Sequence, residues 1–247
     1  PFPFPRIRPG FRETLIQRLD DQKIPFNFIP PSAVRLPNNT KVDNLFTVDK
    51  EVVVQDLSSQ RIGEFLQLAY RPGETTSIWD CCAASGGKSI LAKDILGSID
   101  LTVSDMRESI LANLKKRFAT AGISNYKSFV ADLSAAHCKL PTANYDLLLA
   151  DVPCTGSGTW GRTPEQLYFF QSSAIGKYSD LQKKILGNSL PHLKETGKLL
   201  YTTCSVFEEE NEHIIDFILE RFPLKIERME LLKGYDKRAD TMFAALL

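Results

Sequence analysis

The sequence predicts an α/β fold built on a mostly parallel sheet, and three observations lead to this prediction. From residue 52 onward, short apolar runs alternate with longer segments whose apolar residues recur at helical spacing. Such alternation is typical of parallel strands joined by right-handed crossover helices. The first 50 residues instead carry many prolines around one helical segment, and two apolar runs end the chain with no helix between them. We therefore expect a small N-terminal α+β subdomain in residues 1–50 and a larger α/β domain in residues 51–247.

The expected elements follow one another in a regular order. The N-terminal subdomain should contain a helix over residues 11–21, with short strands and turns around it. The larger domain opens with a helix from Ser58 or Ser59 to Tyr70, which Arg71-Pro72-Gly73 ends. Strands are then predicted at residues 77–79, 100–103, 126–130, 145–150 and 197–203, and helices at 88–96, 108–121 and 208–222. The last apolar runs, 224–229 and 242–247, should form an antiparallel hairpin at the sheet edge.

Composition and charge argue against several classes of protein. The chain has 247 residues and a formal net charge of zero, so RNA binding would depend on a local groove rather than on overall charge. The five cysteines form no repeating pattern and the three histidines lack zinc-ligand spacing, so neither a disulfide framework nor a metal is expected. The sequence contains no apolar run of bilayer length and no signal peptide, which favours a cytoplasmic protein. Because the chain starts at Pro1 rather than Met, we expect that further domains have been left out.

A glycine-rich turn follows the first predicted strand of the larger domain. Gly86 and Gly87 permit a close backbone approach that a side chain would block, and the next helix presents unpaired N–H groups, which suits a nucleotide-like cofactor. The turn lacks the G-x-G-x-x-G of dinucleotide folds, which disfavours NAD. Cys82 stands where a phosphate loop needs glycine, so ATP is a weaker alternative. A plain strand-to-helix turn is the competing interpretation.

Two acidic residues follow the next predicted strands. Asp105 closes the second strand, where a carboxylate can accept both hydroxyls of a ribose, and Asp132 closes the third, where it could meet an adenine amino group. Both could instead cap helices, and Glu108 would complete a capping box with Asp105. The series of glycine turn and two acids favours a cofactor site more strongly than any one member does.

Two cysteines, Cys154 and Cys204, each follow a short apolar run, where an open parallel sheet places its active-site loops. The pair predicts two thiols that share one substrate. Ser205-Val206-Phe207-Glu208 fits a capping box, which would set Cys204 just before a helix N-terminus and lower its pKa, while the nearby glutamates act in the opposite direction. Cys81 and Cys138 are interpreted as residues without a chemical role.

Taken in order, these motifs resemble those of the Sun/RsmB family of RNA cytosine-5 methyltransferases. The family's C-A-A-P-G-G-K is matched by Cys82-Ala83-Ala84-Ser85-Gly86-Gly87-Lys88, and its D-A-P-C-S-G by Asp151-Val152-Pro153-Cys154-Thr155-Gly156. Its T-C-S followed by glutamates is matched by Thr203-Cys204-Ser205 before Glu208-Glu209-Glu210-Asn211-Glu212. The similarity covers roughly residues 52–247. Ser85 for proline and Val152 for alanine are mild departures that concern loop stiffness rather than chemistry.

The resemblance implies a fold, a cofactor and a substrate. The fold would be the class I methyltransferase (Rossmann-like) type with a seven-stranded, mostly parallel sheet, preceded by an incomplete, RNA-binding N-terminal subdomain. The cofactor would be S-adenosylmethionine and the product 5-methylcytosine in RNA, with ribosomal RNA favoured over transfer RNA. The residues implied in cofactor binding are Cys82, Ala83, Ala84, Ser85, Gly86, Gly87, Lys88, Asp105, Arg107, Asp132 and Asp151.

The same resemblance implies the catalytic residues. Carbon 5 of cytosine is too electron-poor to take a methyl group until a thiolate has added to carbon 6. Cys204 would be that nucleophile, and Cys154 would assist release of the product by helping to remove the C5 proton. Asp151 can hydrogen-bond the ring N3 and the exocyclic amine, and it would donate to N3 when protonated. Lys88 would hold either Asp151 or a neighbouring polar group, and a solvated lysine in the first helical turn is the competing interpretation.

The segment after Cys154 has two interpretations. Thr163-Pro164-Glu165-Gln166 fits a capping box with Pro164 at the first helical position. Trp160, Arg162 and the aromatic residues 168–170 could line a groove for single-stranded RNA, whereas core packing is the competing role for most of the aromatic side chains.

Two other functions stay open at this point. A DNA cytosine-5 methyltransferase would use Cys154 as its nucleophile, and Thr203-Cys204-Ser205 argues against it. A noncatalytic ribosome-assembly factor would keep the fold as an RNA-binding scaffold, and the intact Cys154, Cys204 and Asp151 argue against that.

Overall fold

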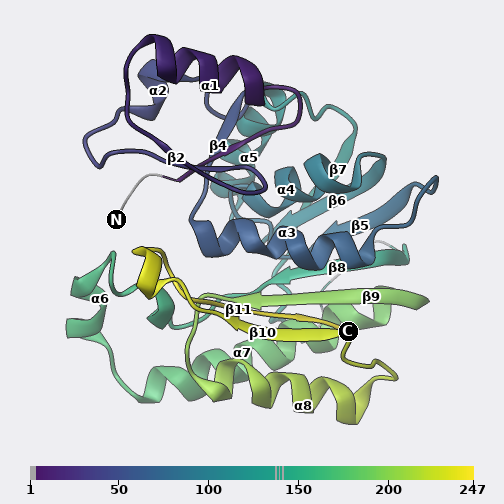
Figure 1. Ribbon diagram of the computed structural model, residues 1–247. Helices are drawn as coiled ribbons and strands as arrows, with labels where there is room; N and C mark the ends of the chain where they lie inside the picture. Colours follow the sequence, from purple (N-terminus) through teal and green to yellow (C-terminus); the bar gives the residue numbers. More distant parts are fainter. Residues whose placement is uncertain (1–3, 137, 139, 141) are drawn as a thin grey trace.

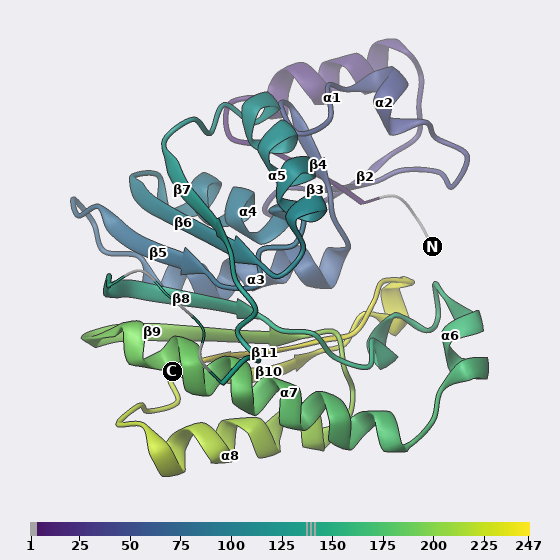
Figure 2. The same cartoon turned by 180° about the vertical axis from the view of Figure 1, so that it is seen from behind.

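Two sheets organise the chain in the computed structural model, which describes residues 4–136, 138, 140 and 142–247 (Figure 1). Residues 1–3 of the predicted N-terminal subdomain lie outside the described residues. The small sheet lies at one end of the molecule, and the large sheet runs through the remainder between two layers of helices (Figures 1 and 2).

The small sheet has four antiparallel strands in the order β2-β3-β1-β4. They are β1 (Pro5–Ile7), β2 (Asn27–Ile29), β3 (Ala33–Arg35) and β4 (Val52–Val54). Helix α1 (Arg12–Asp21) confirms the helix predicted at residues 11–21, and the short helix α2 (Val42–Leu45) follows β3. Leu15 and Leu19 of α1 pack with Val34 and Val52 in a separate small core. The fourth strand comes from residues beyond 50, so this sheet reaches into the segment assigned to the larger domain.

The large sheet confirms the predicted seven-stranded, mostly parallel architecture. Its order is β10-β11-β9-β8-β5-β6-β7, with parallel pairing from β9 to β7 and antiparallel pairing of β10 and β11. The strands are β5 (Thr76–Asp80), β6 (Ile99–Asp105), β7 (Tyr126–Val130), β8 (Tyr145–Asp151), β9 (Leu193–Thr203), β10 (Arg228–Leu232) and β11 (Met242–Leu246). The predicted terminal hairpin is present, with β10 at the edge and β11 inserted between it and β9. Its first strand was expected at residues 224–229 but begins only at Arg228.

Helices cover both faces of the large sheet. On one face lie α3 (Leu57–Ala69), α4 (Gly87–Leu96) and α5 (Glu108–Thr120), and on the other α7 (Ser173–Ser189) and α8 (Glu212–Arg221) (Figure 2). The apolar face of α3 meets α4 through Ile62, Phe65 and Ile90 in one core cluster. Ile185 of α7 and Ile214 of α8 belong to the other cluster. The short helix α6 (Pro164–Phe169) buries no residue.

Two helix starts differ from the prediction. Asp56, rather than Ser58 or Ser59, caps α3: its carboxylate accepts a hydrogen bond from the Ser58 backbone N–H. The last helix was expected from residue 208, but residues Glu208–Glu210 form a 3-10 turn, η3, and α8 begins only at Glu212.

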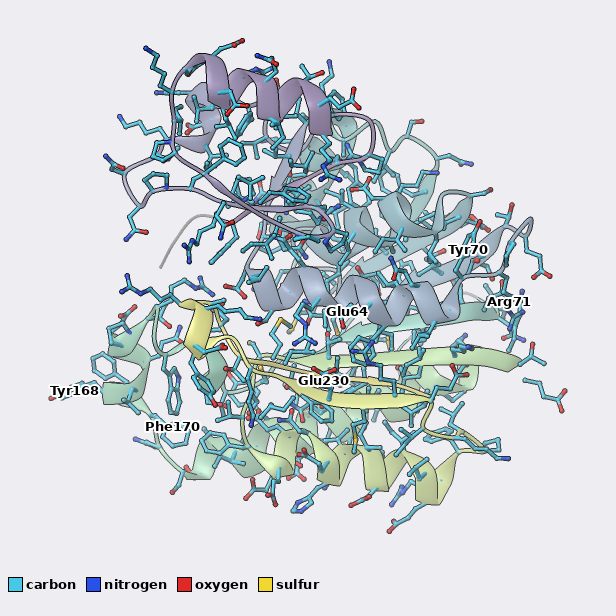
Figure 3. All side chains as sticks on the ribbon, in the orientation of Figure 1. Glu64, Tyr70, Arg71, Tyr168, Phe170 and Glu230 are labelled. Carbon is cyan, nitrogen blue, oxygen red and sulfur yellow. The ribbon has the colours of Figure 1, made fainter. Side chains whose placement is uncertain are left out.

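Ion pairs join the N-terminal subdomain to the large domain, and others join helix α3 to strand β10. Asp94 of α4 accepts from Arg6 at 2.7 Å and from Arg8 at 2.8 Å, and all three side chains are nearly buried. Arg117 of α5 binds Asp49 at 2.6 Å. Figure 3 shows Glu64 of α3 facing Glu230 of β10, and the arginines Arg61 and Arg228 bridge these carboxylates.

Candidate active site

The candidate site lies at the carboxyl ends of β5, β8 and β9, which are neighbours in the sheet. These strands end at Asp80, Asp151 and Thr203. In an open parallel sheet, loops from adjacent strands meet at this edge. The glycine turn, the D-V-P-C segment and the T-C-S segment, which are far apart in sequence, are thus brought together.

The glycine turn between β5 and α4 is tightly shaped. Ala84 has a φ of +45° and Gly86 a φ of +81°, both in the left-handed region. A Cβ on Gly86 would lie 2.5 Å from the Phe118 ring, so this position requires glycine. The Ala84 N–H donates to Asp105, and Arg117 donates to both the carbonyl and the hydroxyl of Ser85. The turn is therefore fixed from outside by α5 and β6.

A cleft of about 210 Å³ opens beside this turn. Of the residues implied in cofactor binding, it is lined by Cys82, Ala83, Ala84, Ser85, Gly87, Lys88 and Asp151. The sequence reasoning missed its other lining residues, which are Val53, Val54, Gln55, Ser59, Asp80 and Arg117. A larger cavity of about 740 Å³ lies between the N-terminal subdomain and helices α3 and α4, but none of the implied site residues lines it.

The structure places the remaining implied cofactor residues outside the wall of this cleft. Asp105 is almost buried, and its carboxylate accepts hydrogen bonds from the Ala84 N–H and from the Arg107 backbone and side chain. Arg107 is more than half exposed and directly precedes the first residue of α5. Asp132 is exposed, and its contacts with the Ser134 N–H and hydroxyl lower its pKa. Asp105 supports the turn, whereas Asp132 stands at the end of β7, two strands from β5.

Asp80 is the strand-end acid that the sequence reasoning did not select. It is 1% exposed, and its Oδ2 accepts from the Ser89 hydroxyl at 2.6 Å. Its Oδ1 has no hydrogen-bond partner among the residues that the structure describes. Burial, with the neighbouring charge of Asp151, raises the pKa of Asp80 to about 7. A signal was available, because Asp80 is the last residue of the strand that precedes the glycine turn.

The predicted contact between Lys88 and Asp151 is present. The Lys88 Nζ lies 2.6 Å from Asp151 Oδ2, and the Thr202 hydroxyl donates to Asp151 Oδ1 at 2.8 Å. Both carboxylate oxygens are thus engaged, one by a charge and one by a neighbouring strand. This arrangement fixes the direction in which the carboxylate faces the cleft.

Cys154 and Cys204 meet at the same place. Their sulfur atoms lie 3.3 Å apart, and each residue is half-buried. The hydrogen bond from the Cys154 thiol lowers the pKa of Cys204, and the charge of Lys88 acts in the same direction, against burial and the carboxylates of Asp151 and Asp240. The same hydrogen bond, together with burial, raises the pKa of Cys154 well above its usual value. Cys204 is therefore the more acidic thiol of the pair, and Cys154 is the thiol that keeps its proton.

The predicted cause of that acidity was wrong. Ser205 does not cap a helix at residue 208; its hydroxyl accepts from the Phe207 N–H and donates to Glu210. Since α8 begins only at Glu212, Cys204 is not placed directly before its N-terminus. The neighbouring thiol and Lys88 take the role that the helix dipole was expected to have.

The aromatic segment after Cys154 divides into two groups. Trp160, Phe170 and Phe207 pack on one another, with Phe170 and Phe207 stacked at 5.6 Å. Tyr168 is 85% exposed and Phe169 75% exposed, and Figure 3 shows Tyr168 projecting outward from α6. Pro164 is the first residue of α6, as predicted, but the Thr163 hydroxyl donates to the Thr159 carbonyl instead of capping the helix. Arg162 pairs with Asp240 at 2.7 Å.

Two features are absent from the part of the chain that the structure describes. No helix there combines the length and apolar character that a membrane crossing needs. Within those same residues, His, Cys, Asp and Glu side chains form no cluster of three or more that could hold a metal ion.

Solved structures show the class to which the fold belongs. The chain superposes on NSun6 from Pyrococcus horikoshii with SFG, with a TM-score of 0.81 at 16% identity over 99% of this chain and 90% of that one. It superposes on a methyltransferase homolog protein from the same organism with a TM-score of 0.77 at 22% identity, over 100% of this chain and 86% of that one. The fold is the Rossmann-like one of the class I methyltransferases.

Sequence comparison gives the family. Residues 65–241 match the family model described as 16S rRNA methyltransferase RsmB/F. Ribosomal RNA small subunit methyltransferase B from Proteus mirabilis is 31% identical over 191 residues, which are 75% of this chain and 43% of the relative. The enzyme of that name from Cronobacter sakazakii is 32% identical over 199 residues, 78% of this chain and 44% of the relative. The chain belongs to the RsmB/F family, as the Sun/RsmB resemblance predicted, and spans less than half the length of these relatives.

Proposed function

We propose that this chain carries the catalytic site of an RNA cytosine-5 methyltransferase that uses S-adenosylmethionine. The observation that supports this most directly is the 3.3 Å contact between the sulfurs of Cys154 and Cys204, beside the Lys88–Asp151 ion pair. A reaction that begins with addition of a thiolate and ends with its release can use two thiols of different acidity. The transfer of a methyl group is inferred from membership of the RsmB/F family.

The cleft beside the glycine turn fits the cofactor. Its wall includes the carboxyl group of Asp80, whose Oδ1 has no hydrogen-bond partner among the described residues, and a Cβ on Gly87 would meet only the Arg117 side chain, at 4.0 Å. We assign the cofactor to the residues that line this cleft, with Asp105 holding the turn in place and Arg107 and Asp132 on its periphery. When bound there, S-adenosylmethionine supplies the methyl group that carbon 5 of the cytosine receives.

Cys204 is the proposed nucleophile. Its thiolate gives an electron pair to carbon 6 of the ring, forming an S–C6 bond, and the electrons of the C5–C6 double bond move toward carbon 5 and the N3 side of the ring. Asp151, oriented by Lys88 and Thr202, accepts a hydrogen bond from the exocyclic amine. In its protonated form it donates to N3, and this proton stabilises the negative charge that develops there. Carbon 5 becomes the nucleophile that accepts the methyl group.

Cys154 assists the release step as a hydrogen-bond donor, not by helping to remove the C5 proton as the resemblance implied, because its contact with Cys204 and its burial raise the pKa of its thiol. The C5 proton leaves to solvent, its electron pair rebuilds the C5–C6 double bond, and the S–C6 electron pair returns to Cys204. The Cys154 thiol hydrogen-bonds the Cys204 sulfur at the moment when negative charge returns to that atom. Without this donor, Cys204 is a poorer leaving group and the covalent adduct persists.

The substrate that we propose is ribosomal RNA rather than transfer RNA, with the protein acting in the cytoplasm. The choice of ribosomal RNA is supported by the relatives from Proteus mirabilis and Cronobacter sakazakii, each of which is named ribosomal RNA small subunit methyltransferase B. The target base must leave its stack to reach a cleft at the sheet edge. With a net charge of zero, the chain should bind bare RNA weakly and with marked salt dependence.

Trapping of the adduct tests the proposal. Incubated with ribosomal RNA and S-adenosylmethionine, Cys154→Ala should accumulate a protein–RNA adduct that survives denaturing electrophoresis. Cys204→Ala should form neither adduct nor 5-methylcytosine, and the double variant should behave like Cys204→Ala. Cys138→Ala is the matched control, because this thiol lies outside the site, and it should retain normal turnover.

Other outcomes would lead to different conclusions. An adduct from Cys204→Ala but not from Cys154→Ala would reverse the roles and indicate the mechanism of DNA cytosine-5 methyltransferases. Undiminished methyl transfer by both single variants would exclude covalent catalysis. Binding of RNA by the unmodified chain with no methyl transfer to any RNA would favour the scaffold function.

A further inference from the structure

Glu210 lies between the two thiol-bearing loops and contacts both. It ends the 3-10 turn η3 and is fully buried. Its Oε1 accepts from the Thr155 N–H at 2.8 Å, and its Oε2 accepts from the Thr155 hydroxyl at 2.6 Å and from the Ser205 hydroxyl at 2.5 Å. Thr155 directly follows Cys154, and Ser205 directly follows Cys204. One carboxylate thus connects the two residues next to the two thiols.

Further hydrogen bonds fix Glu210 and the loops around it. The buried Tyr201 hydroxyl donates to the Glu210 carbonyl at 2.6 Å. Gln182 of α7 donates to the Pro153 carbonyl at 2.9 Å and approaches Glu210 Oε1 at 3.4 Å. Ser157 bridges the loops a second time, since its hydroxyl accepts from the Val206 N–H and contacts the Ser205 hydroxyl. A buried carboxylate surrounded by donors makes charge-assisted hydrogen bonds, which are stronger than neutral ones.

The charge of Glu210 acts unequally on the two thiols. The hydrogen bond with Cys204 and burial raise the pKa of Cys154 most, and the charge of Glu210 adds to them. The carboxylates that oppose ionisation of Cys204 are instead Asp151 and Asp240. Lys88 favours ionisation of Cys204. Besides Glu210, the titratable or charged groups that act on the pair are Lys88 from α4, Asp151 from β8, Tyr201 from β9, and Arg162 and Asp240 from the loops.

We infer that Glu210 is a positioning residue: with two hydrogen bonds from Thr155 and one from Ser205, it ties the two thiol-bearing loops together and places its charge beside the Cys154 loop, so that Cys154 stays the protonated partner of the pair. This inference rests on the proposed function, because that reaction needs one thiolate and one thiol at the same place. Glu210 reaches neither the cleft wall nor the thiols by any hydrogen bond in the structure, so it acts through its neighbours.

Thiol alkylation tests the inference without RNA or cofactor. The full chain is treated with iodoacetamide at a series of pH values from 6 to 10, and the labelling rates of Cys154 and Cys204 are read separately by peptide mass spectrometry. In the unmodified chain, Cys204 should react faster at pH 7 and have the lower midpoint. In Glu210→Gln, which keeps size and one acceptor oxygen but removes the charge, the midpoint of Cys154 should fall and its rate at pH 8 should rise at least threefold.

Glu209→Gln is the matched control, because it makes the same charge change one residue away at an exposed position. It should keep both midpoints of the unmodified chain. If Glu210→Gln also keeps them while its circular dichroism shows an intact fold, the charge of Glu210 does not order the thiols and the inference is overturned.

Thr155→Val provides a milder variant in case Glu210→Gln fails to fold. It removes the hydroxyl donor from the Cys154 loop while the carboxylate and its charge remain. Labelling of Cys154 should become at least twofold faster at every pH with its midpoint unchanged, because the loop opens more often. Labelling at the unmodified rate would show that the bond from the Thr155 hydroxyl to Glu210 does not hold this loop, and would contradict the inference. Since no outcome depends on RNA, a negative result leaves the assignment of methyl transfer to be decided by adduct trapping.

Discussion

At the scale of single residues, Asp80 shows how burial controls charge beneath the proposed cofactor cleft. Its side chain ends β5, accepts from Ser89 and leaves Oδ1 without a partner in the described part of the chain. A buried carboxyl group is more stable in its neutral form unless donors or cations compensate it. Here the one hydroxyl donor does not offset burial, and a pKa of about 7 results.

Asp80 should make stability depend on pH. The pKa of Asp80 in the folded chain is about 7, against about 3.9 for an exposed aspartate, so the folded state holds this proton more tightly than the unfolded state. The resulting stabilisation is complete below about pH 4 and is lost as the pH rises through about 7. Asp80→Asn, which cannot ionise, should therefore gain on the order of 2 to 4 kcal/mol relative to the unmodified chain between pH 5 and 8.

Urea unfolding followed at several pH values measures this difference. Asp100→Asn is the control, because Asp100 is more than half exposed and should give a pH dependence like that of the unmodified chain. If the free energies of unfolding of Asp80→Asn and of the unmodified chain change with pH in the same way, Asp80 is ionised in the folded chain over the whole pH range.

At the scale of elements, the strand-to-helix turn depends on Gly86 for two separable reasons. Its φ of +81° disfavours any side chain, and a Cβ would collide with Phe118 of α5. Gly86→Ala should therefore cost about 1–2 kcal/mol for the backbone and about 1–3 kcal/mol more for overpacking. Because the turn lines the cleft, cofactor affinity should fall as well.

Gly122→Ala separates the two contributions. Gly122 has a φ of +72°, and a Cβ there would meet no described atom within 4 Å, so this variant should lose only the backbone part. Thermal unfolding of both variants gives the comparison, and calorimetric titration with S-adenosylmethionine gives the affinity. Equal losses for the two variants would mean that the Phe118 contact relaxes at no cost.

Most elements were predictable from the sequence, whereas the caps were not. Apolar runs identified the five parallel strands of the large sheet because this pattern is local. The helix α7 was not predicted, and β10 was expected several residues too early. The capping box at Ser205 failed because a buried carboxylate, Glu210, recruits the serine hydroxyl. Asp56 caps α3 while it also accepts from the backbone N–H of Asp240, which no local pattern reveals.

The site was predictable to a similar extent. Strand-end residues such as Asp151 and Cys204 follow apolar runs and carry motifs, so sequence alone selects them. Arg117 and Gln182 reach the site from helices. The spacing of apolar residues in a helix shows which face packs against the core, but it does not distinguish these two polar residues from others on the surface.

At the scale of the whole molecule, Asp94 joins the N-terminal subdomain to the large domain. It lies on α4, is 5% exposed and binds both Arg6 and Arg8 of the small unit. Removal of one partner from a buried ion pair leaves a charge without compensation and costs about 3–5 kcal/mol. Asp94→Asn should therefore lower the free energy of unfolding by about that amount, with a smaller loss if the amide oxygen retains one arginine.

Asp100→Asn again supplies the comparison, since the Lys127–Asp100 pair is exposed and such pairs contribute about 0–1 kcal/mol. Chemical denaturation of both variants gives the free energies, and limited proteolysis of residues 4–54 shows whether the small unit detaches. A loss below about 1 kcal/mol for Asp94→Asn would show that the junction depends on packing rather than on this triad.

The register between β8 and β9 has a consequence for the two thiols. Asp151 pairs with Thr202 in the parallel ladder, so Cys154 and Cys204 follow the same rung of the sheet by three and by two residues. The sheet thus holds the two cysteines at nearly equivalent positions, so that their sulfur atoms lie in the same part of the site. The loops decide which thiol attacks, because the carboxylate of Glu210 acts on Cys154 and the ammonium group of Lys88 acts on Cys204. A few substitutions could therefore exchange the roles of the two cysteines without moving any strand.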